Sequence, residues 1–174
     1  SKVTARLAQE AGLDAIHVSA HGDANRGITY STGHATHVPG GFVSNAQAIK
    51  SVVDIPVIVP GRIEPKDADR LIGQGSFDFL TMGRKLLADP HLPRKLAEGR
   101  EPDIRPCIYC YTCISNIFHG SHIICAVNHN TSREVENPEA NSQTPSKNIA
   151  VIGGGPAGME VSRLLAARGP RLSL

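Results

Sequence analysis

Four cysteines lie in one short stretch of the chain, at Cys107, Cys110, Cys113 and Cys125. Two residues separate each of the first three, and eleven precede the fourth. Three closely spaced thiolates can surround one side of a small inorganic core while a fourth arrives from further along the chain, which suits a [4Fe–4S] cluster. Tetrahedral zinc is the alternative, although zinc modules more often use two separated Cys-x-x-Cys pairs. The spacing predicts a metal centre and leaves both chemistries open.

A second motif is the glycine-rich turn Gly153-x-Gly155-x-x-Gly158, between an apolar run at 148–152 and a helical pattern that runs to Arg168. In a dinucleotide-binding turn the first glycine permits the tight turn, the second admits the pyrophosphate, and the third lets helix pack on strand. The pyrophosphate then sits at the helix N-terminus. The acidic residue that would hold the ribose falls beyond this sequence, so FAD and NAD(P) both stay open.

Two Gly-Arg pairs, Gly61-Arg62 and Gly83-Arg84, each directly follow an expected strand. Glycine lets main-chain N–H groups approach phosphate oxygens, and arginine adds charge with a forked set of donors. In a (β/α)8 barrel, the loops after the last two strands commonly hold a phosphate. Solvated arginines that pair with nearby acids are the alternative interpretation.

Three histidines, His21, His34 and His37, lie in a long loop over 20–42 that is rich in Gly, His, Ser and Thr. A loop of that length inside a compact domain is usually functional. We keep His21 as the candidate for a substrate-facing proton donor, and the catalytic residue is otherwise unknown. His34 and His37 have no acidic third ligand nearby, so they do not predict a metal site.

The remaining residues alternate between helical and strand patterns. Helical patterns cover 3–11, 44–53, 65–74 and 91–98, and strand patterns cover 14–19, 55–59 and 77–82. This alternation predicts a parallel sheet with helices outside it. Three such strands fit a doubly wound sheet or part of a (β/α)8 barrel, which needs eight. Because the chain starts without Met, we expect it to begin in the middle of a longer protein.

Composition narrows the function classes. The chain has 174 residues, 40% of them hydrophobic and 20% charged, as in globular domains. A net charge of +2, from 18 basic and 16 acidic residues, does not suggest a nucleic-acid partner. No apolar run approaches the roughly 18 residues of a membrane span. Clustered cysteines behind an amphipathic rather than signal-like N-terminus predict a reducing, cytoplasmic setting.

In their order along the chain, four segments resemble the multi-cofactor branch of the old yellow enzyme family. They are IPVIVPGRIEP, FDFLTMGRKLLADP, RPCIYCYTCI with its later cysteine, and NIAVIGGGPAGME. That branch includes 2,4-dienoyl-CoA reductase, enoate reductase, trimethylamine dehydrogenase and related NADH:flavin oxidoreductases. Its members carry an FMN barrel, a [4Fe–4S] cluster, and a domain for FAD and NAD(P)H. The resemblance implies an α/β chain with the last three β/α units of the barrel at 1–100, the cluster at 101–129, a linker at 130–147, and the start of a Rossmann-like domain at 148–174.

The resemblance also assigns site residues. It implies that FMN is held by Gly61, Arg62, Gly83 and Arg84. It implies that the cluster is ligated by Cys107, Cys110, Cys113 and Cys125. It implies that the FAD pyrophosphate meets Gly153, Gly155, Ala157 and Gly158.

The implied activity is a relay from NAD(P)H through FAD and the cluster to FMN, which reduces an activated C=C bond of a small molecule of the 2-enoate or dienoyl-CoA type. Two residues separate the second and third cysteines, as in the trimethylamine dehydrogenase branch, so an amine dehydrogenase stays as an alternative. A non-catalytic zinc-binding module is the other alternative. We expect these 174 residues to be inactive by themselves, since the resemblance leaves most of the barrel upstream.

Overall fold

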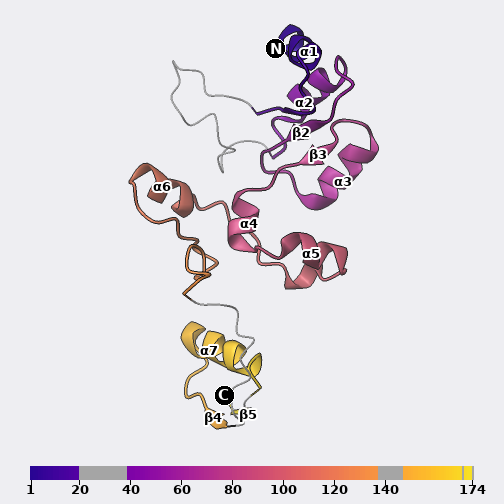
Figure 1. The fold of residues 1–174 in the computed structure, drawn as a ribbon. Coiled ribbons are helices and arrows are strands. Elements are labelled where there is room, and N and C mark those ends of the chain that lie inside the picture. The colour runs from indigo at the N-terminus through magenta and orange to yellow at the C-terminus, as the bar shows by residue number, and fades with distance from the viewer. Residues whose placement is uncertain (20–38, 137–146, 170, 174) are drawn as a thin grey trace. The chain divides into compact units, whose positions relative to one another are not determined.

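The computed structural model describes residues 1–19, 39–136, 147–169 and 171–173 (Figure 1). These fall into two compact units, Ser1–Asn128 and His129–Leu174. The candidate donor His21 and its neighbours His34 and His37 lie outside the described residues, as does most of the expected linker.

A parallel sheet of three short strands organises the first unit. Its strands are β1 (Ile16–His17), β2 (Val57–Val59) and β3 (Phe79–Leu80), in the order β1-β2-β3. Val57 and Val59 are fully buried, as expected of a β-branched run inside a sheet covered by helices. Because all three strands are parallel, the residues that follow β2 and β3 emerge at the same edge of the sheet.

Three helices accompany this sheet (Figure 1): α1 (Lys2–Glu10), α2 (Val43–Lys50) and α3 (Pro65–Gly73). Helix α2 packs on β2, and α1 packs against α2. Proline at the first position of α3 has no N–H to leave unsatisfied there. The buried apolar side chains form one core, to which the sheet and all three helices contribute: Ala5, Ala46, Ile49, Val53, Val57, Val59, Ile63, Ala68 and Phe77.

After β3 the chain forms short helices that lead into the cysteine segment. They are α4 (Arg84–Ala88), α5 (Leu92–Ala97), a 3₁₀ turn (Glu101–Asp103) and α6 (Thr112–Phe118). The sequence patterns predict α5, but they do not predict α4 or α6. Helix α4 begins directly after Gly83, so Arg84 occupies its first turn.

The second unit is a β-α-β element. Strand β4 (Asn148–Ala150) and strand β5 (Arg171–Ser173) pair in parallel, and α7 (Pro156–Ala166) connects them. The glycine-rich turn lies between β4 and α7, which is the arrangement that the sequence predicts for the start of a dinucleotide-binding fold.

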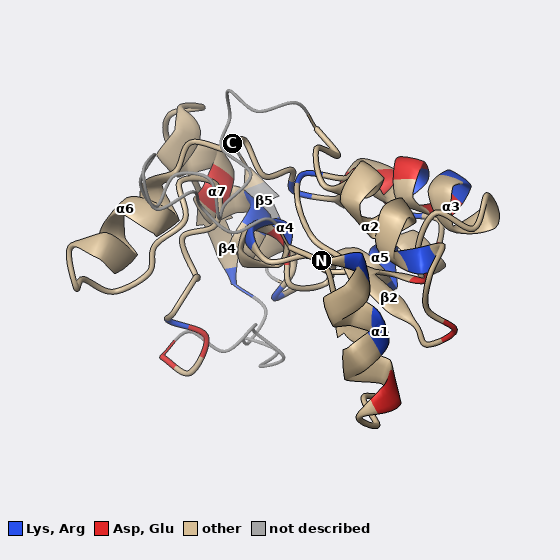
Figure 2. Cartoon of the chain, turned by 90° about the horizontal axis from the view of Figure 1, so that it is seen from above, with Lys and Arg blue, Asp and Glu red and all other residues tan. Residues whose placement is uncertain are grey.

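Helix α3 carries charged side chains of both signs. Lys66 and Arg70 flank Asp67 and Asp69, and red and blue segments adjoin on this helix in Figure 2. Such a face offers no continuous basic surface. In the part of the chain that the structure describes, no helix is both long enough and apolar enough to cross a membrane.

Candidate functional site

The two Gly-Arg pairs lie where the parallel strands β2 and β3 end. Gly61 adopts a left-handed φ of 100°, and a Cβ there would approach Phe42 Cδ2 to 2.8 Å. Only glycine fits this close turn without moving the phenylalanine ring. Gly83 is the N-cap of α4, which fixes the start of the helix that carries Arg84. The fold thus brings Arg62 and Arg84, which are 22 positions apart in the chain, to one edge of the sheet.

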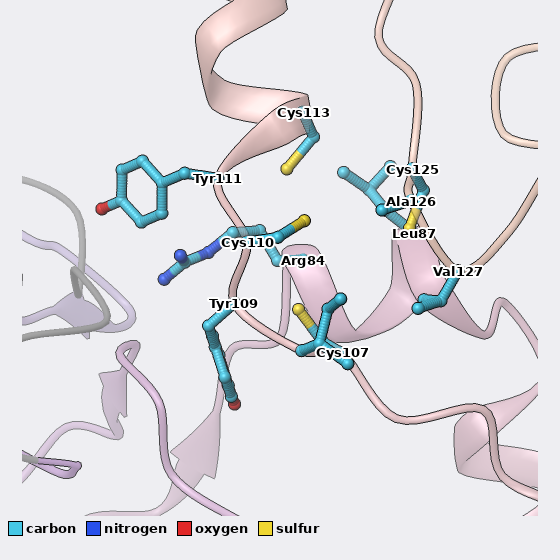
Figure 3. A pocket seen from close by; sticks show the side chains of 11 residues that line it. Arg84, Leu87, Cys107, Tyr109, Cys110, Tyr111, Cys113, Cys125, Ala126 and Val127 are labelled. Carbon is cyan, nitrogen blue, oxygen red and sulfur yellow. The ribbon is translucent and has the colours of Figure 1, made fainter.

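One aromatic ring joins the two arginines. The guanidinium carbon of Arg62 lies 4.4 Å from the ring centroid of Tyr109, and that of Arg84 lies 5.3 Å from it. Arg84 also lies 5.0 Å from the ring of Tyr111, so its guanidinium sits between two tyrosines (Figure 3). Cation–π contacts of this kind contribute about 0.5–1 kcal/mol when exposed and about 2 kcal/mol when desolvated.

A third cation belongs to the same cluster. Lys85 Nζ lies 5.5 Å from the Tyr109 ring centroid and donates a hydrogen bond to Glu64 at 2.5 Å. Tyr109 donates its hydroxyl proton to the other oxygen of Glu64 at 3.3 Å. Burial alone would lower the pKa of Lys85, but interactions with Glu64 and Tyr109 outweigh it and raise that pKa. Three cations facing one carboxylate leave an excess of positive charge, which suits an anionic ligand.

Both tyrosines hold an uncommon backbone conformation. Tyr109 has φ of 53° and Tyr111 has φ of 67°, in the left-handed region that bulky residues rarely adopt. Such a conformation costs about 1–3 kcal/mol at each residue and persists only where the surroundings enforce it. The arginine contacts offset part of this cost, and Cys110 lies between the two strained residues.

The four cysteines line a common cavity (Figure 3). Cys107 and Cys110 belong to the extended segment before α6, Cys113 lies in α6, and Cys125 comes from the segment that follows it. Their side chains point into the space between these segments (Figure 3). All four are free thiols. The remaining lining is mostly apolar or aromatic, together with one cation: Leu87, Ile108, Ala126, Val127, Tyr109, Tyr111 and Arg84.

The thiols differ in their tendency to ionise. A hydrogen bond with the Thr112 hydroxyl, at 3.3 Å from the sulfur, lowers the pKa of Cys110, and the Thr112 backbone N–H lowers it further. Burial raises the pKa of Cys113. Metal coordination requires the thiolate form, so a bound metal would favour deprotonation of Cys113 in particular.

The four thiols can be compared with the two metal chemistries that the spacing left open. Zinc in a structural site takes four ligands, with thiolates about 2.3 Å from one centre. Within the described ranges, which contain every cysteine, no three His, Cys, Asp or Glu side chains converge closely enough to hold one ion. Four thiols that line one cavity offer one thiolate for each iron of a [4Fe–4S] cluster, so this set of donors fits such a cluster. Four thiolates also satisfy tetrahedral zinc, which stays the alternative.

Buried Asp89 anchors the entry to the cysteine segment. Its carboxylate accepts hydrogen bonds from Lys95 Nζ at 2.7 Å, the Arg105 backbone N–H at 2.9 Å and the His91 backbone N–H at 3.1 Å. Burial opposes ionisation, but Lys95 and the Arg105 N–H outweigh it and lower the pKa of Asp89. Lys95 also donates to the Asp103 carbonyl at 2.8 Å. The ion pair thus fixes the backbone two residues before Cys107.

The exit from the segment is tied to the same helix. Asn128, which is buried, donates its side-chain amide to the Leu87 carbonyl at 2.8 Å. Arg105 donates to the Ala88 carbonyl at 3.3 Å. Helix α4 therefore carries Arg84 in its first turn and holds both ends of the cysteine segment with its last carbonyls.

In the second unit, the glycine-rich turn shows why glycine is needed. A Cβ on Gly158 would collide with the Gly153 carbonyl oxygen, so α7 approaches the turn too closely for any side chain at that position. Gly155 is the N-cap of α7, and Ala157 lies in its first turn. Nothing lies within 4 Å of a Cβ built on Gly153 or Gly155. This leaves space in front of the helix N-terminus for a phosphate.

Residues 2–103 match the family described as the NADH:flavin oxidoreductase / NADH oxidase family. The match covers more than half of the chain. This protein belongs to that family. The membership confirms the resemblance to old yellow enzyme-type oxidoreductases and identifies the three β/α units as part of a TIM barrel.

Individual relatives in the NADH:flavin oxidoreductase family extend the match past the barrel. An NADH oxidase of Thermoanaerobacter brockii is 39% identical over 99% of this chain and 27% of its own length. A cinnamate reductase of Clostridium sporogenes is 33% identical over 98% of this chain and 25% of its own length. Amine dehydrogenases also occur among the relatives.

A solved structure of a 2-naphthoyl-CoA reductase in complex with 2-naphthoyl-CoA superimposes with a TM-score of 0.82 at 30% identity. It covers 97% of this chain and 26% of that one. The chain thus spans about a quarter of the length of the relatives that it matches.

The structure brings the two arginines predicted to hold FMN close to the cysteines predicted to ligate the cluster. Arg84 lines the cysteine cavity and also joins Arg62 across Tyr109. Sequence reasoning missed Tyr109 and its neighbour Tyr111, as well as the anchors Asp89 and Asn128. A Tyr-x-Tyr pair around Cys110 was visible in the sequence, but nothing in it signals a left-handed backbone or contacts with distant arginines.

Proposed function

We propose that this chain is a part of a flavin and iron–sulfur oxidoreductase that contributes residues to three cofactor sites. When bound, FAD, a [4Fe–4S] cluster and FMN would supply the redox chemistry, so that NAD(P)H is oxidised and an activated C=C bond gains a hydride and a proton. The observation that carries this proposal is the double position of Arg84, which lines the cysteine cavity and belongs to the arginine cluster at the strand ends.

The strand-end residues have a direct task in this proposal. Arg62 and Arg84 provide forked donors to the anionic parts of FMN, and Gly61 and Gly83 let the backbone approach it. The raised pKa of Lys85 keeps a third positive charge beside them. Positive charge near a flavin favours its anionic reduced form, so the same cluster serves binding and redox tuning.

The cysteine segment provides ligands and a shell. Cys107, Cys110, Cys113 and Cys125 would each give one thiolate to the cluster. Leu87, Ile108, Ala126 and Val127 give the cavity an apolar lining. An apolar shell of this kind raises the sensitivity of a metal centre to nearby charge, including that of Arg84.

The second unit would accept the dinucleotide. Gly153, Gly155, Ala157 and Gly158 form the turn and the first residues of α7, where backbone N–H groups point away from the helix toward a ligand. We assign FAD to this turn because the resemblance to the multi-cofactor branch implies it, and because two relatives match over 99% and 98% of this chain, which includes the turn. NAD(P)H would then donate its hydride to that flavin.

We propose a 2-enoate or an aromatic or dienoyl thioester as the class of acceptor, and a cytoplasmic site of action. The cinnamate reductase and 2-naphthoyl-CoA reductase matches support this class. The specific alternative is oxidation of an amine, with electrons leaving the flavin for the cluster. The two-residue spacing between Cys110 and Cys113 and the amine dehydrogenase relatives favour that alternative.

The test is anaerobic turnover by the intact protein that carries this chain. We expect NADH or NADPH to bleach the flavin absorbance, and a 2-enoate such as cinnamate to restore it with one alkene reduced per NAD(P)H oxidised. An amine that bleaches the flavin, combined with no turnover of any enoate or enoyl thioester, would establish the amine dehydrogenase alternative instead.

A further inference from the structure

We propose that Tyr109 couples the two cofactor sites, so that a loaded cysteine cavity strengthens flavin binding through the positions of Arg62 and Arg84. This inference rests on the proposed function, since it needs a cluster in the cavity and FMN at the strand ends. It goes further by making the affinity of one site depend on the occupancy of the other, and by assigning that dependence to one side chain.

Tyr109 lies in the middle of the cysteine motif. Cys107 precedes Tyr109 and Cys110 follows it, and the thiols of both cysteines face the cavity (Figure 3). Ligation of both cysteines to one core would fix the backbone on either side of Tyr109. The ring could then no longer shift without moving a ligand.

The Tyr109 ring contacts three cationic side chains. Arg62, Arg84 and Lys85 all lie within 5.5 Å of its centroid, and its hydroxyl donates to Glu64. These residues come from the ends of β2 and β3 and from the start of α3 and α4. A fixed ring therefore positions the two arginines that we assign to FMN, while a mobile ring leaves them free to take other rotamers.

The backbone of Tyr109 is in a left-handed conformation. Its φ of 53° is unfavourable for a side chain of this size, so the conformation needs support from outside the residue. Ligation of the flanking cysteines is such a support. Without ligation, the conformation depends on the contacts of the ring alone, so the ring has more freedom to leave the arginines. Coupling of this kind is reciprocal, so bound flavin would also strengthen cluster retention.

The test is a thermodynamic cycle on the intact protein. FMN dissociation constants are measured by flavin fluorescence for the cluster-loaded protein and for the same protein after chelation of its iron, with reconstitution as the reversal. We expect loss of the cluster to weaken FMN binding by on the order of tenfold, within the usual range of couplings between sites. In Tyr109→Gly the ratio of the two constants should fall close to one.

Glycine accepts the left-handed backbone, so Tyr109→Gly removes the ring without adding strain. Two further variants serve as comparisons. Tyr109→Phe keeps the ring and should keep the coupling. The matched control is Phe118→Leu, an aromatic of the same segment whose side chain is 63% exposed on α6, and it should also keep the coupling.

Equal FMN affinity with and without the cluster in the unaltered protein would overturn the inference while leaving the proposed function intact. Coupling that persists in Tyr109→Gly would also overturn it, because the ring would then not be the link. An intact protein that binds neither iron nor FMN would overturn the proposed function, and the inference with it.

Discussion

At the ends of β2 and β3, two guanidinium groups approach one tyrosine ring from different elements. Arg62 follows β2, Arg84 opens α4, and Tyr109 comes from the cysteine segment. No sequence pattern relates these three positions. The Gly-Arg repeat after each strand predicted that the arginines share an edge of the sheet, because parallel strands end on the same side. The tyrosine could not be predicted, because its position depends on how the segment folds back.

The charge of Arg62 leads to a prediction on flavin affinity. Replacing it in Arg62→Ala should weaken FMN binding by roughly 10- to 100-fold, since a hydrogen bond to a charged group contributes about 1.5–3 kcal/mol. Flavin fluorescence titration of the intact protein measures this. The control is Arg70→Ala on α3, where the arginine is 58% exposed and pairs only loosely with Asp67. Equal affinities of the two variants would contradict the flavin role of Arg62.

The glycine turn leads to a prediction on the second unit. In Gly158→Ala the new methyl group meets the Gly153 carbonyl oxygen, so helix and turn must separate. Overpacking of this kind costs about 1–3 kcal/mol, and we expect FAD content to fall as well. Thermal unfolding and flavin analysis of the intact protein measure both. Gly154→Ala is the control for stability, because its Cβ would meet nothing within 4 Å. A Gly158→Ala protein with full FAD content and unchanged stability would argue against a dinucleotide turn.

Among the elements, the sequence patterns predicted all those up to β3 and also α5, but they did not predict α4 or α6. The amphipathic patterns at 65–74 and 91–98 correspond to α3 and α5, and the apolar run at 55–59 contains β2. Helix α4 has five residues, fewer than two turns, and therefore shows no periodicity to detect. Helix α6 does carry a helical spacing, with Cys113, Ile114, Ile117 and Phe118 at suitable intervals, but the cysteine motif hides it.

Helix α4 carries Arg84 in its first turn and contacts both ends of the cysteine segment, and its C-cap residue Asp89 holds the start of that segment. Asp89→Ala leaves Lys95 without its buried partner and the Arg105 N–H without an acceptor. Breaking a buried ion pair costs about 3–5 kcal/mol. We expect the free energy of unfolding to fall by this amount, measured by urea unfolding with far-UV circular dichroism as the signal. We also expect the variant to retain iron less well. Asp67→Ala is the control, because its pair with Arg70 is exposed and contributes at most about 1 kcal/mol.

The same carboxylate predicts a dependence on pH. The folded pKa of Asp89 lies below its ordinary value of 3.8. A depressed carboxyl pKa stabilises the fold above the unfolded pKa, and that contribution is lost as pH falls through the folded value. The free energy of unfolding should therefore drop on acidification below about pH 4, and the drop should be smaller in Asp89→Ala. Identical acid sensitivity of both proteins would show that Asp89 does not contribute in this way.

At the scale of the whole molecule, the chain spans about a quarter of the length of the relatives that it matches. Residue types and spacing predicted the parallel β/α units and the glycine-rich turn between a strand and a helix, while the cysteine ligands and the dinucleotide site stay predictions. They could not predict that Arg84 lines the cysteine cavity, because this depends on α4 holding both ends of the cysteine segment through Leu87 and Ala88. Hydrogen bonds to single backbone carbonyl groups, such as those of Leu87 and Ala88, produce no periodic pattern in a sequence.

The identity of the metal bound by the four cysteines is the most direct test of the proposed function. Iron, zinc and acid-labile sulfide should be determined together on the intact protein after anaerobic purification. The account predicts about four iron and four sulfide per chain. About one zinc per chain without sulfide would contradict it, because the four thiols would then hold a structural ion and no electrons could pass between the flavin sites by this route.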